Sequence, residues 1–265
     1  LIALTAAATA TTRLRVGTIV IDNDYRHPAM LAKEAATLDL LSGGRFELGL
    51  GAGWLRSEYD AMGMTFDRNG VRVDRMTEAI TVLKGLFSEG SFSFSGEHYQ
   101  IDDLELFPKP AQRPHPPILI GGGKRRVLTL AGKEADIVGI LTTSVATGTV
   151  VDDPNERTID GIREKLGWVR AGAGERFKQI ELSIIPNLVV SDDRLRSAER
   201  VIEEHGWIGI GPGDVLEMPS MLIGTVDEIV ETMCARRDDL GFSYYIVSDK
   251  ITEQFAPIIE CLSGK

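Results

Sequence analysis

The chain alternates short apolar runs with longer stretches of helical periodicity, and no other feature of the sequence constrains the fold as strongly. Six apolar runs are predicted to be strands, and they begin near residues 15, 46, 118, 136, 181 and 243. Helical patterns occupy residues 28–41, 67–87, 124–134, 157–171, 193–205, 226–240 and 253–262. Helices of this length between short buried strands indicate parallel βα units.

Two architectures accept such units. A doubly wound sheet would accept six strands, whereas a (β/α)8 barrel needs eight strands in about 250 residues or more. Leu1 already lies inside an alanine-rich helical pattern, which fits a barrel that lacks its first two strands. We therefore predict one α/β domain over residues 1–265, a TIM-like (β/α)8 barrel with about six of its eight units. A small hairpin at 91–101 and a loop at 207–220 interrupt the pattern.

Composition argues against several classes of function. The net charge of −10 disfavours binding to nucleic acid or to an anionic membrane. No apolar run reaches the roughly 18 residues that cross a bilayer, and the first residues lack the pattern of a signal peptide. We therefore expect a cytoplasmic protein that acts on a small molecule. Cys234 and Cys261 lie in helical patterns, and we expect both thiols to be free and buried.

One strand carries glycine at every second position. The stretch Phe46–Tyr59 reads FELGLGAGWLRSEY, with Gly49, Gly51 and Gly53 in alternation. Glycine weakens a strand because it costs more chain entropy and packs no side chain. Alternate residues share one face of a strand, so this strand has one bare face. We expect another backbone or a flat ligand to lie close against it.

A second glycine-rich segment predicts an anion site. Residues 118–126, ILIGGGKRR, combine a buried strand, a glycine turn and a helix start with three cations. The segment is no P-loop, because Arg125 replaces the required hydroxyl, and Arg56 stands where a Rossmann glycine would follow Gly53. Free N–H groups at a helix start bind anions, whereas cations there oppose the helix dipole. A bound phosphate would explain the cations; the alternative is an ordinary βα turn with solvated lysine and arginine.

Candidate catalytic side chains are less distinct. Trp54 either covers the barrel mouth as a core aromatic residue or lines a pocket beside the bare glycine face. Glu58 and Asp60 are expected to be solvated or capping side chains, and His27 is expected to mark a helix entry. The other histidines show no metal spacing, so no metal site is predicted from His98, His115 and His205. The sequence thus indicates a cofactor cradle more clearly than a catalyst.

Three blocks of the chain resemble the bacterial luciferase-like monooxygenase superfamily, most closely its branch that uses coenzyme F420, a deazaflavin. The blocks are RVGTIVIDNDYRHPAMLAKEAATLDLLSGGRFELGLGAGWLRSEYDAMG, PHPPILIGGGKRRVLTLAGKEADIV and SMLIGTVDEIVETMCARRDDLGFSYYIVS. The resemblance covers nearly the whole chain and is weakest at 145–177 and 207–219. It implies a TIM-like barrel with the cofactor across the C-terminal ends of the strands.

The resemblance also implies which residues contact the cofactor. In this family the strand end at Ile19–Val20 often carries a non-prolyl cis peptide against the ring, and Trp54 would stand at the reaction pocket. The bare glycine face would then admit the tricyclic ring. The matching positions beside the ring, on the glycine strand and in the phosphate loop are Ile19, Val20, Asp22, Asn23, Ala52, Ser57, Gly122, Gly123, Lys124, Arg125, Arg126 and Val127.

The implied function is that of an F420-dependent oxidoreductase, which transfers a hydride between the deazaflavin and a small organic substrate. The family's acid or base on the second barrel strand has no counterpart here, so we expect it in about 50 to 60 residues upstream of Leu1. Some sugar-phosphate dehydrogenases of the family carry a catalytic glutamate where this chain has Trp54, which argues against that activity.

Two alternatives to this function stay open. The chain could be an FMN-dependent monooxygenase, because FMN also carries a phosphate and composition does not separate the two cofactors. It could also be a homologue that binds a cofactor without catalysing a reaction. For each of these functions we expect a homodimer.

Overall fold

The computed structural model describes residues 1–145 and 147–263, so residues 146, 264 and 265 of the predicted domain lie outside the described part. The helices are α1 (Ile2–Ala10), α2 (Pro28–Ser42), α3 (Arg56–Ala61), α4 (Asn69–Phe87), α5 (Arg125–Glu134), α6 (Ile159–Ala173), α7 (Arg194–His205), α8 (Pro212–Glu217), α9 (Val226–Leu240) and α10 (Thr252–Leu262). The strands are β1 (Val16–Gly17), β2 (Ile21–Asp22), β3 (Phe46–Gly51), β4 (Ser91–Ser95), β5 (Gln100–Glu105), β6 (Ile118–Gly122), β7 (Ile137–Ile140), β8 (Glu181–Ile184), β9 (Asn187–Val190), β10 (Met221–Gly224) and β11 (Phe242–Tyr245). Short 3-10 turns are η1 (Asn23–Tyr25), η2 (Pro154–Arg157), η3 (Gly174–Gln179) and η4 (Asp249–Ile251).

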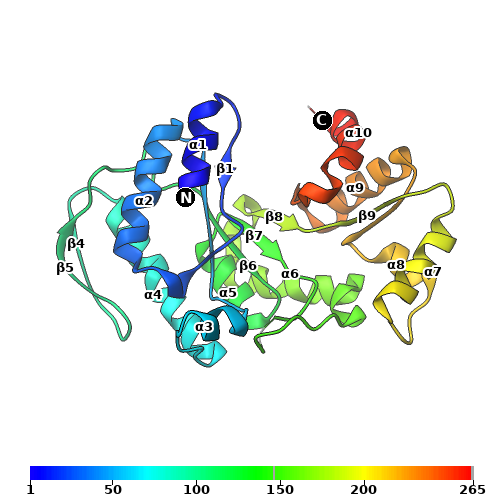
Figure 1. Cartoon of the computed structure of the whole chain (residues 1–265), viewed down its shortest axis with the longest axis horizontal. Helices are drawn as coiled ribbons and strands as arrows, with labels where there is room; N and C mark the ends of the chain where they lie inside the picture. Colours follow the sequence, from blue (N-terminus) through cyan, green and yellow to red (C-terminus); the bar gives the residue numbers. More distant parts are fainter. Residues whose placement is uncertain (146, 264–265) are drawn as a thin grey trace.

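The main sheet is parallel, and its strands coincide with the six runs predicted from the sequence. Its order is β1-β3-β6-β7-β8-β11, and β2 also pairs with β3. Figure 1 shows α2 and α4 near one end of this sheet and α5 and α6 along its length. The alternation of strands and helices along the chain therefore produces the βα units that the sequence predicts.

The sheet curls so far that side chains of β3 and β11 meet across its interior. Strands β3 and β11 are four positions apart in the order, which in a flat sheet would separate them by about 19 Å. The Tyr244 hydroxyl on β11 nevertheless donates a hydrogen bond of 3.0 Å to Glu47 on β3. Burial and the neighbouring Glu47 raise the pKa of Tyr244 to about 12, so the hydroxyl keeps its proton. The predicted α/β class with a curled, barrel-type parallel sheet is confirmed.

Local sequence sets the ends of the principal helices, as predicted. Helix α2 begins at Pro28, whose missing N–H is not needed in a first turn, and it ends at Gly43 with a left-handed φ of 67°. Helix α9 follows a capping box: the Thr225 hydroxyl accepts the Glu228 N–H, and the Glu228 carboxylate accepts the Thr225 N–H.

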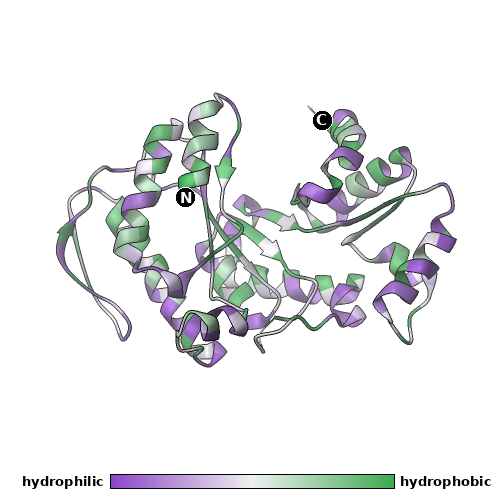
Figure 2. Ribbon diagram, viewed as in Figure 1, coloured by the Kyte–Doolittle hydropathy of each residue, from purple (hydrophilic) through white to green (hydrophobic). Residues whose placement is uncertain are grey.

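The hydrophobic core lies between the sheet and its helices. Phe46, Leu48 and Leu50 of β3 are fully buried in the main hydrophobic cluster, whereas the alternate residue Glu47 faces the curled interior. Figure 2 shows both green and purple residues along α5 and α6, as expected of helices that cover a core with one face. Among the described helices, none combines the length and apolarity needed to cross a membrane.

Two predicted strands are divided in the structure, which corrects the sequence prediction. The run at 15–21 forms β1 and β2, and a cis Ile19–Val20 peptide lies between them, where the resemblance implies one. The run at 181–190 forms β8 and β9, because Pro186 has no N–H to donate to a continuous ladder. Strand β8 stays in the main sheet, whereas β9 pairs with β10 in a separate two-stranded sheet.

The remaining differences concern short elements. The predicted loop at 207–220 contains α8, and the four-residue β10 directly after it was not predicted. The predicted hairpin is confirmed as the antiparallel pair β4–β5, although it extends to Glu105; it lies at the far left of Figure 1. Both cysteines are free, as expected, but each is only partly buried.

The link between Tyr244 and Glu47 gives a stability prediction with a matched control. Tyr244→Phe removes a hydrogen bond to a charged group, and we expect the free energy of unfolding to fall by about 1–2 kcal/mol. Tyr245→Phe is the control, because the buried Tyr245 hydroxyl has no partner among the described residues; this change should be neutral or stabilising. Urea unfolding of both variants measures the difference, and equal stabilities would show that the Tyr244–Glu47 contact does not stabilise the curled sheet.

Candidate active site

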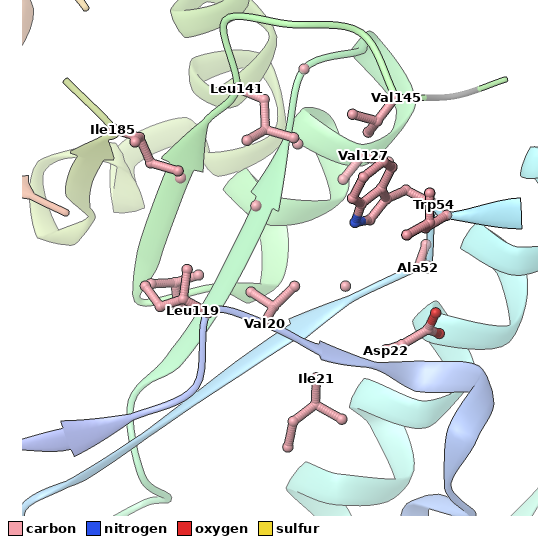
Figure 3. Close-up of a pocket in the computed structure, with 18 of the residues that line it drawn as sticks. Val20, Ile21, Asp22, Ala52, Trp54, Leu119, Val127, Leu141, Val145 and Ile185 are labelled. Atoms are coloured by element: carbon pink, nitrogen blue, oxygen red, sulfur yellow. The ribbon is translucent and has the colours of Figure 1, made fainter. Parts of the chain in front are cut away.

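A cavity of about 570 Å³ lies at the C-terminal ends of the parallel strands. It is lined by the last residue of each of five strands: Asp22, Gly51, Gly122, Ile140 and Ile184. Barrel enzymes bind their ligands at this end of the sheet, and the volume is typical of a pocket for a small molecule. Figure 3 shows the cavity with side chains from several of these strands around it.

The glycine face of β3 is covered by the chain itself. A Cβ at Gly49 would lie 1.8 Å from the Thr18 carbonyl oxygen, and one at Gly51 would lie 2.6 Å from Val20 Cγ2. The glycines therefore admit the Thr18–Val20 segment. This corrects the expectation that the bare face receives the ring, and it selects the other option that the spacing allowed, close approach of another backbone.

Open backbone lies instead on β6 and β7. A Cβ at Gly121 would meet no atom within 4 Å, and Gly139, its partner across the ladder, would place a Cβ only 3.4 Å from the Gly121 Cα. The residue paired with Gly139 on the next strand, β8, is Ser183. Ser183 is fully buried, and its Oγ has no hydrogen-bond partner among the described residues. The cavity therefore has a floor that is almost free of side chains and carries one unsatisfied hydroxyl.

The walls of the cavity are largely apolar. Trp54 is 39% exposed, so it is not a core residue, and in Figure 3 it lies beside Val127 and Val145. Leu119 and Val20 also line the cavity. Of the two positions that the sequence allows for Trp54, the structure therefore selects the pocket wall.

The N-terminus of α5 forms a polar part of the wall. Gly123 and Lys124 line the cavity. Among the described residues no side chain caps the first turn of α5, so its free N–H groups can donate hydrogen bonds to an anion. Two of the three cations have acidic partners: Lys124 pairs with Glu156 and Arg126 with Asp74. These ion pairs give Lys124 and Arg126 a reason to be present that does not require a phosphate.

Glu156 holds two lysines at this edge of the cavity. Its carboxylate contacts Lys124 and also the buried Lys165, whose Nζ lies 2.8 Å away. Burial alone would raise the pKa of Glu156, but hydrogen bonds from the two lysines hold it below its usual value. Arg125 makes no hydrogen bond or ion pair within residues 1–145 and 147–263, and its side chain is exposed.

Two carboxylic acids line the described part of the cavity, Asp22 and Glu58. Asp22 Oδ1 accepts the Asp24 N–H at 2.9 Å, which caps η1, and the Tyr59 hydroxyl lies 2.9 and 2.8 Å from the two carboxyl oxygens. Burial raises the pKa of Asp22. Glu58 accepts a hydrogen bond from Tyr25, whose own pKa is raised to about 12 by burial and by nearby acids.

Most of the cofactor residues implied by the sequence lie around the cavity. Those that line it are Ile19, Val20, Asp22, Ala52, Gly122, Gly123, Lys124 and Val127. Ser57 is exposed on α3, and Arg125 and Arg126 are exposed on α5. Asn23 is only 2% exposed, and its amide donates to the Tyr99 hydroxyl at 3.3 Å rather than lining the cavity.

The sequence did not indicate the floor residues individually. Gly139 is the single glycine in the run DIVGIL, and Ser183 is the single hydroxyl in the run LSII. An interruption of this kind in a buried strand is a usable sign of close approach. Their common position next to Gly121 could not be predicted, however, because it depends on the register of three strands.

Comparison with known proteins identifies related sequences. A family model described as luciferase-like monooxygenase matches residues 1–210. The chain is 30% identical over 179 residues to an FMNH(2)-dependent dimethylsulfone monooxygenase of Pseudomonas putida, which covers 68% of this chain and 45% of the relative. It is 33% identical over 178 residues to an F420-dependent glucose-6-phosphate dehydrogenase of Kineococcus radiotolerans, which covers 67% and 50%. The chain thus spans about half the length of these curated relatives.

Solved structures share the fold. The coenzyme F420-dependent tetrahydromethanopterin reductase of Methanopyrus kandleri matches with a TM-score of 0.72 and 19% identity, over 97% of this chain and 84% of that chain. At this identity the likeness concerns the fold, and it agrees with the curled parallel sheet described above. Because the family model covers most of the sequence, the chain belongs to the luciferase-like monooxygenase family.

Proposed function

We propose that the chain is an F420-dependent oxidoreductase that transfers a hydride between a bound deazaflavin and a small organic substrate. The observation that carries this proposal is the floor at Gly121 and Gly139, which leaves room for a flat ring against the backbone. The family contains both F420-dependent and FMN-dependent members, so a flavin or deazaflavin is the common expectation for the cavity.

The residues of the cavity fit such a cofactor in three respects. The space above Gly121 is open, and a side chain there would fill it. The Ser183 hydroxyl lacks a partner in the part of the chain that the structure describes, and a polar ring edge would supply one. The uncapped first turn of α5 beside Gly123 would hold a phosphate through backbone N–H groups.

The protein's contribution to the reaction follows from these contacts. A bound deazaflavin would supply the hydride chemistry. Gly121 and Gly139 would set the plane of the ring, and the first-turn amides of α5 would fix its phosphate end. Trp54 and Val127 would shield the reacting face from water, because both are apolar and line the cavity.

An FMN-dependent monooxygenase is the second candidate, and the likeness to the dimethylsulfone monooxygenase favours it. Both cofactors present a tricyclic ring and a phosphate, so the floor and α5 suit either of them. The anionic tail of F420 continues beyond its phosphate, whereas that of FMN ends there. The exposed Arg125, which has no partner among the described residues, supports the longer tail.

Titration of each cofactor with the purified 265-residue chain tests the choice. We expect F420 fluorescence to saturate with a lower Kd than FMN fluorescence, and Arg125→Ala to weaken F420 binding several-fold while changing FMN binding less. Arg13→Ala, which removes a charge on an exposed segment away from the cavity, is the control. Tighter binding of FMN would favour the monooxygenase, and binding of neither cofactor would contradict both candidates.

A side chain introduced at Gly121 should strongly weaken cofactor binding without unfolding the protein. Gly121→Leu places a side chain in the open space of the cavity, and we expect the affinity for the cofactor to fall at least 100-fold. Gly167→Leu on α6 is the matched control, because a Cβ there also meets nothing within 4 Å and the residue does not line the cavity. Circular dichroism melting verifies that both variants fold; undiminished binding to Gly121→Leu would place the ring elsewhere.

The Ser183→Ala variant should weaken cofactor binding without lowering the free energy of unfolding. Loss of one hydrogen bond to the ring should weaken cofactor binding about fivefold, which corresponds to about 1 kcal/mol. The free energy of unfolding should stay constant or rise, since the buried hydroxyl has no partner within residues 1–145 and 147–263. Ser220→Ala is the control, because Ser220 is equally buried and unpartnered but lies outside the cavity lining. Equal cofactor affinities in the two variants would rule out a role for Ser183.

A further inference from the structure

The Tyr59 hydroxyl lies between two carboxyl groups at the edge of the cavity. It is 2.8 and 2.9 Å from the oxygens of Asp22 and 3.1 Å from Asp24 Oδ2. A phenol has one hydrogen to donate, so it cannot hydrogen-bond to two ionised carboxylates at once. One additional proton on this group of three side chains would satisfy the contacts, and like charges at such distances favour the uptake of that proton.

The surroundings place the additional proton on Asp22. Asp24 is 3% exposed in its side chain, and its Oδ2 pairs with the Arg75 guanidinium at 2.9 Å. Asp22 makes no ion pair with any described residue. Asp24 Oδ1 has no hydrogen-bond partner among the described residues, and Asp24 Oδ2 already contacts the Arg75 guanidinium. A proton on Asp22 Oδ2, by contrast, lies within reach of the Tyr59 oxygen.

A glycine at position 53 leaves the space that the Asp22 and Tyr59 side chains occupy. Gly53 has a φ of 73°, and a Cβ there would lie 2.0 Å from the Tyr59 hydroxyl and 2.5 Å from Asp22 Oδ2. The nearby Arg72 forms no ion pair with Asp22; its guanidinium donates to the carbonyl oxygens of Ala52 and Asp67. Figure 3 shows the Asp22 carboxyl beside Ala52, below Trp54 in that view.

We propose that Asp22 is present in the cavity as a protonated carboxyl and donates a hydrogen bond to a carbonyl oxygen of the bound ring. Flavin and deazaflavin rings both carry carbonyl oxygens on one edge, so the proposal holds for either cofactor. Because Asp22 Oδ1 already accepts the Asp24 N–H, Oδ2 would carry the proton. In the absence of a ligand, Asp22 Oδ2 donates this proton in a hydrogen bond to the Tyr59 oxygen. A carbonyl oxygen of a bound ring would compete with Tyr59 as the acceptor. The proposal rests on the proposed binding of a flavin or deazaflavin.

The electrostatic surroundings agree with this protonation state. Burial is the main cause that raises the pKa of Asp22, and the neighbouring Asp24 also raises it, whereas the Asp24 N–H, Tyr59 and Arg72 lower it. The titratable and charged side chains that face Asp22 or its partners come from η1, α3 and α4, and they are Asp24, Tyr25, Glu58, Tyr59, Arg72 and Arg75.

The first test needs no cofactor. The folded state holds the Asp22 proton more tightly than the unfolded state, whose ordinary pKa is 3.8. Stability should therefore fall as pH rises from 3.8 through the raised pKa of the folded protein. Asp22→Asn cannot ionise, so it should gain stability relative to the natural chain over that interval and lose the advantage below pH 3.8. Asp102→Asn, an exposed residue on β5, is the control. Urea unfolding that shows no such pH-dependent difference would overturn the protonation.

The second test measures the hydrogen bond to the ring. The Kd for F420 and for FMN is determined by fluorescence between pH 5 and 9 with the natural chain and with Asp22→Asn. We expect binding to the natural chain to weaken several-fold with rising pH relative to Asp22→Asn, whose amide remains a donor.

The outcomes of the two tests are distinguishable. Parallel pH profiles for the natural chain and Asp22→Asn, or tighter binding at high pH, would show that Asp22 is not a donor to the ring. Absence of binding by either cofactor at every pH would overturn the proposed function and with it the contact to the ring, whereas unfolding would still report the proton on Asp22.

Discussion

The close approach between the Thr18–Val20 segment and the backbone of β3 is the constraint on which the site depends. The Thr18 hydroxyl donates to the Gly49 carbonyl and accepts the Gly49 N–H, both at 2.9 Å. No side chain could occupy the Gly49 position, because its Cβ would collide with the Thr18 carbonyl. This contact makes Val20 part of the cavity wall and brings Asp22, at the end of β2, to the Gly53 turn. The absence of side chains at Gly49 and Gly51 thus determines where the chemistry-bearing residues lie.

Charges near the cavity are largely paired within the protein, and this makes the few unpaired groups informative. Lys124 and Lys165 share Glu156, and Arg75 pairs with Asp24. Among the described residues that line the cavity, groups with unused hydrogen-bonding capacity include the first-turn amides of α5, the Ser183 hydroxyl and Asp22. Apolar walls separate these groups from the surroundings. A flat ligand with an anionic end and a polar ring edge is the kind of molecule that such an arrangement suits.

Patterns of neighbouring residues predicted most helices and strands correctly. The contacts that they did not predict depend on how distant segments of the chain align with one another. Capping at Thr225 and the glycine after α2 depend on neighbouring residues, so the sequence indicates them. The spacing of Gly49 and Gly51 predicted a close approach but not its occupant, since that depends on how β1, β2 and the Thr18–Val20 segment between them lie along β3. Likewise, Arg126 meets Asp74 across 52 residues of sequence, and no local pattern distinguishes such a pair from a cation that awaits a phosphate.

The two sets of strand glycines therefore have different physical meanings. Each glycine within a strand costs roughly 0.5–1 kcal/mol relative to alanine, and at Gly49 the contact with Thr18 offsets that cost. At Gly121 the same cost has no compensation inside the protein, because a side chain would meet nothing within 4 Å. A strand glycine that faces open space at the C-terminal end of a parallel sheet is better explained by a group that binds there. The distinction rests on what a Cβ would meet, which spacing along the sequence does not contain.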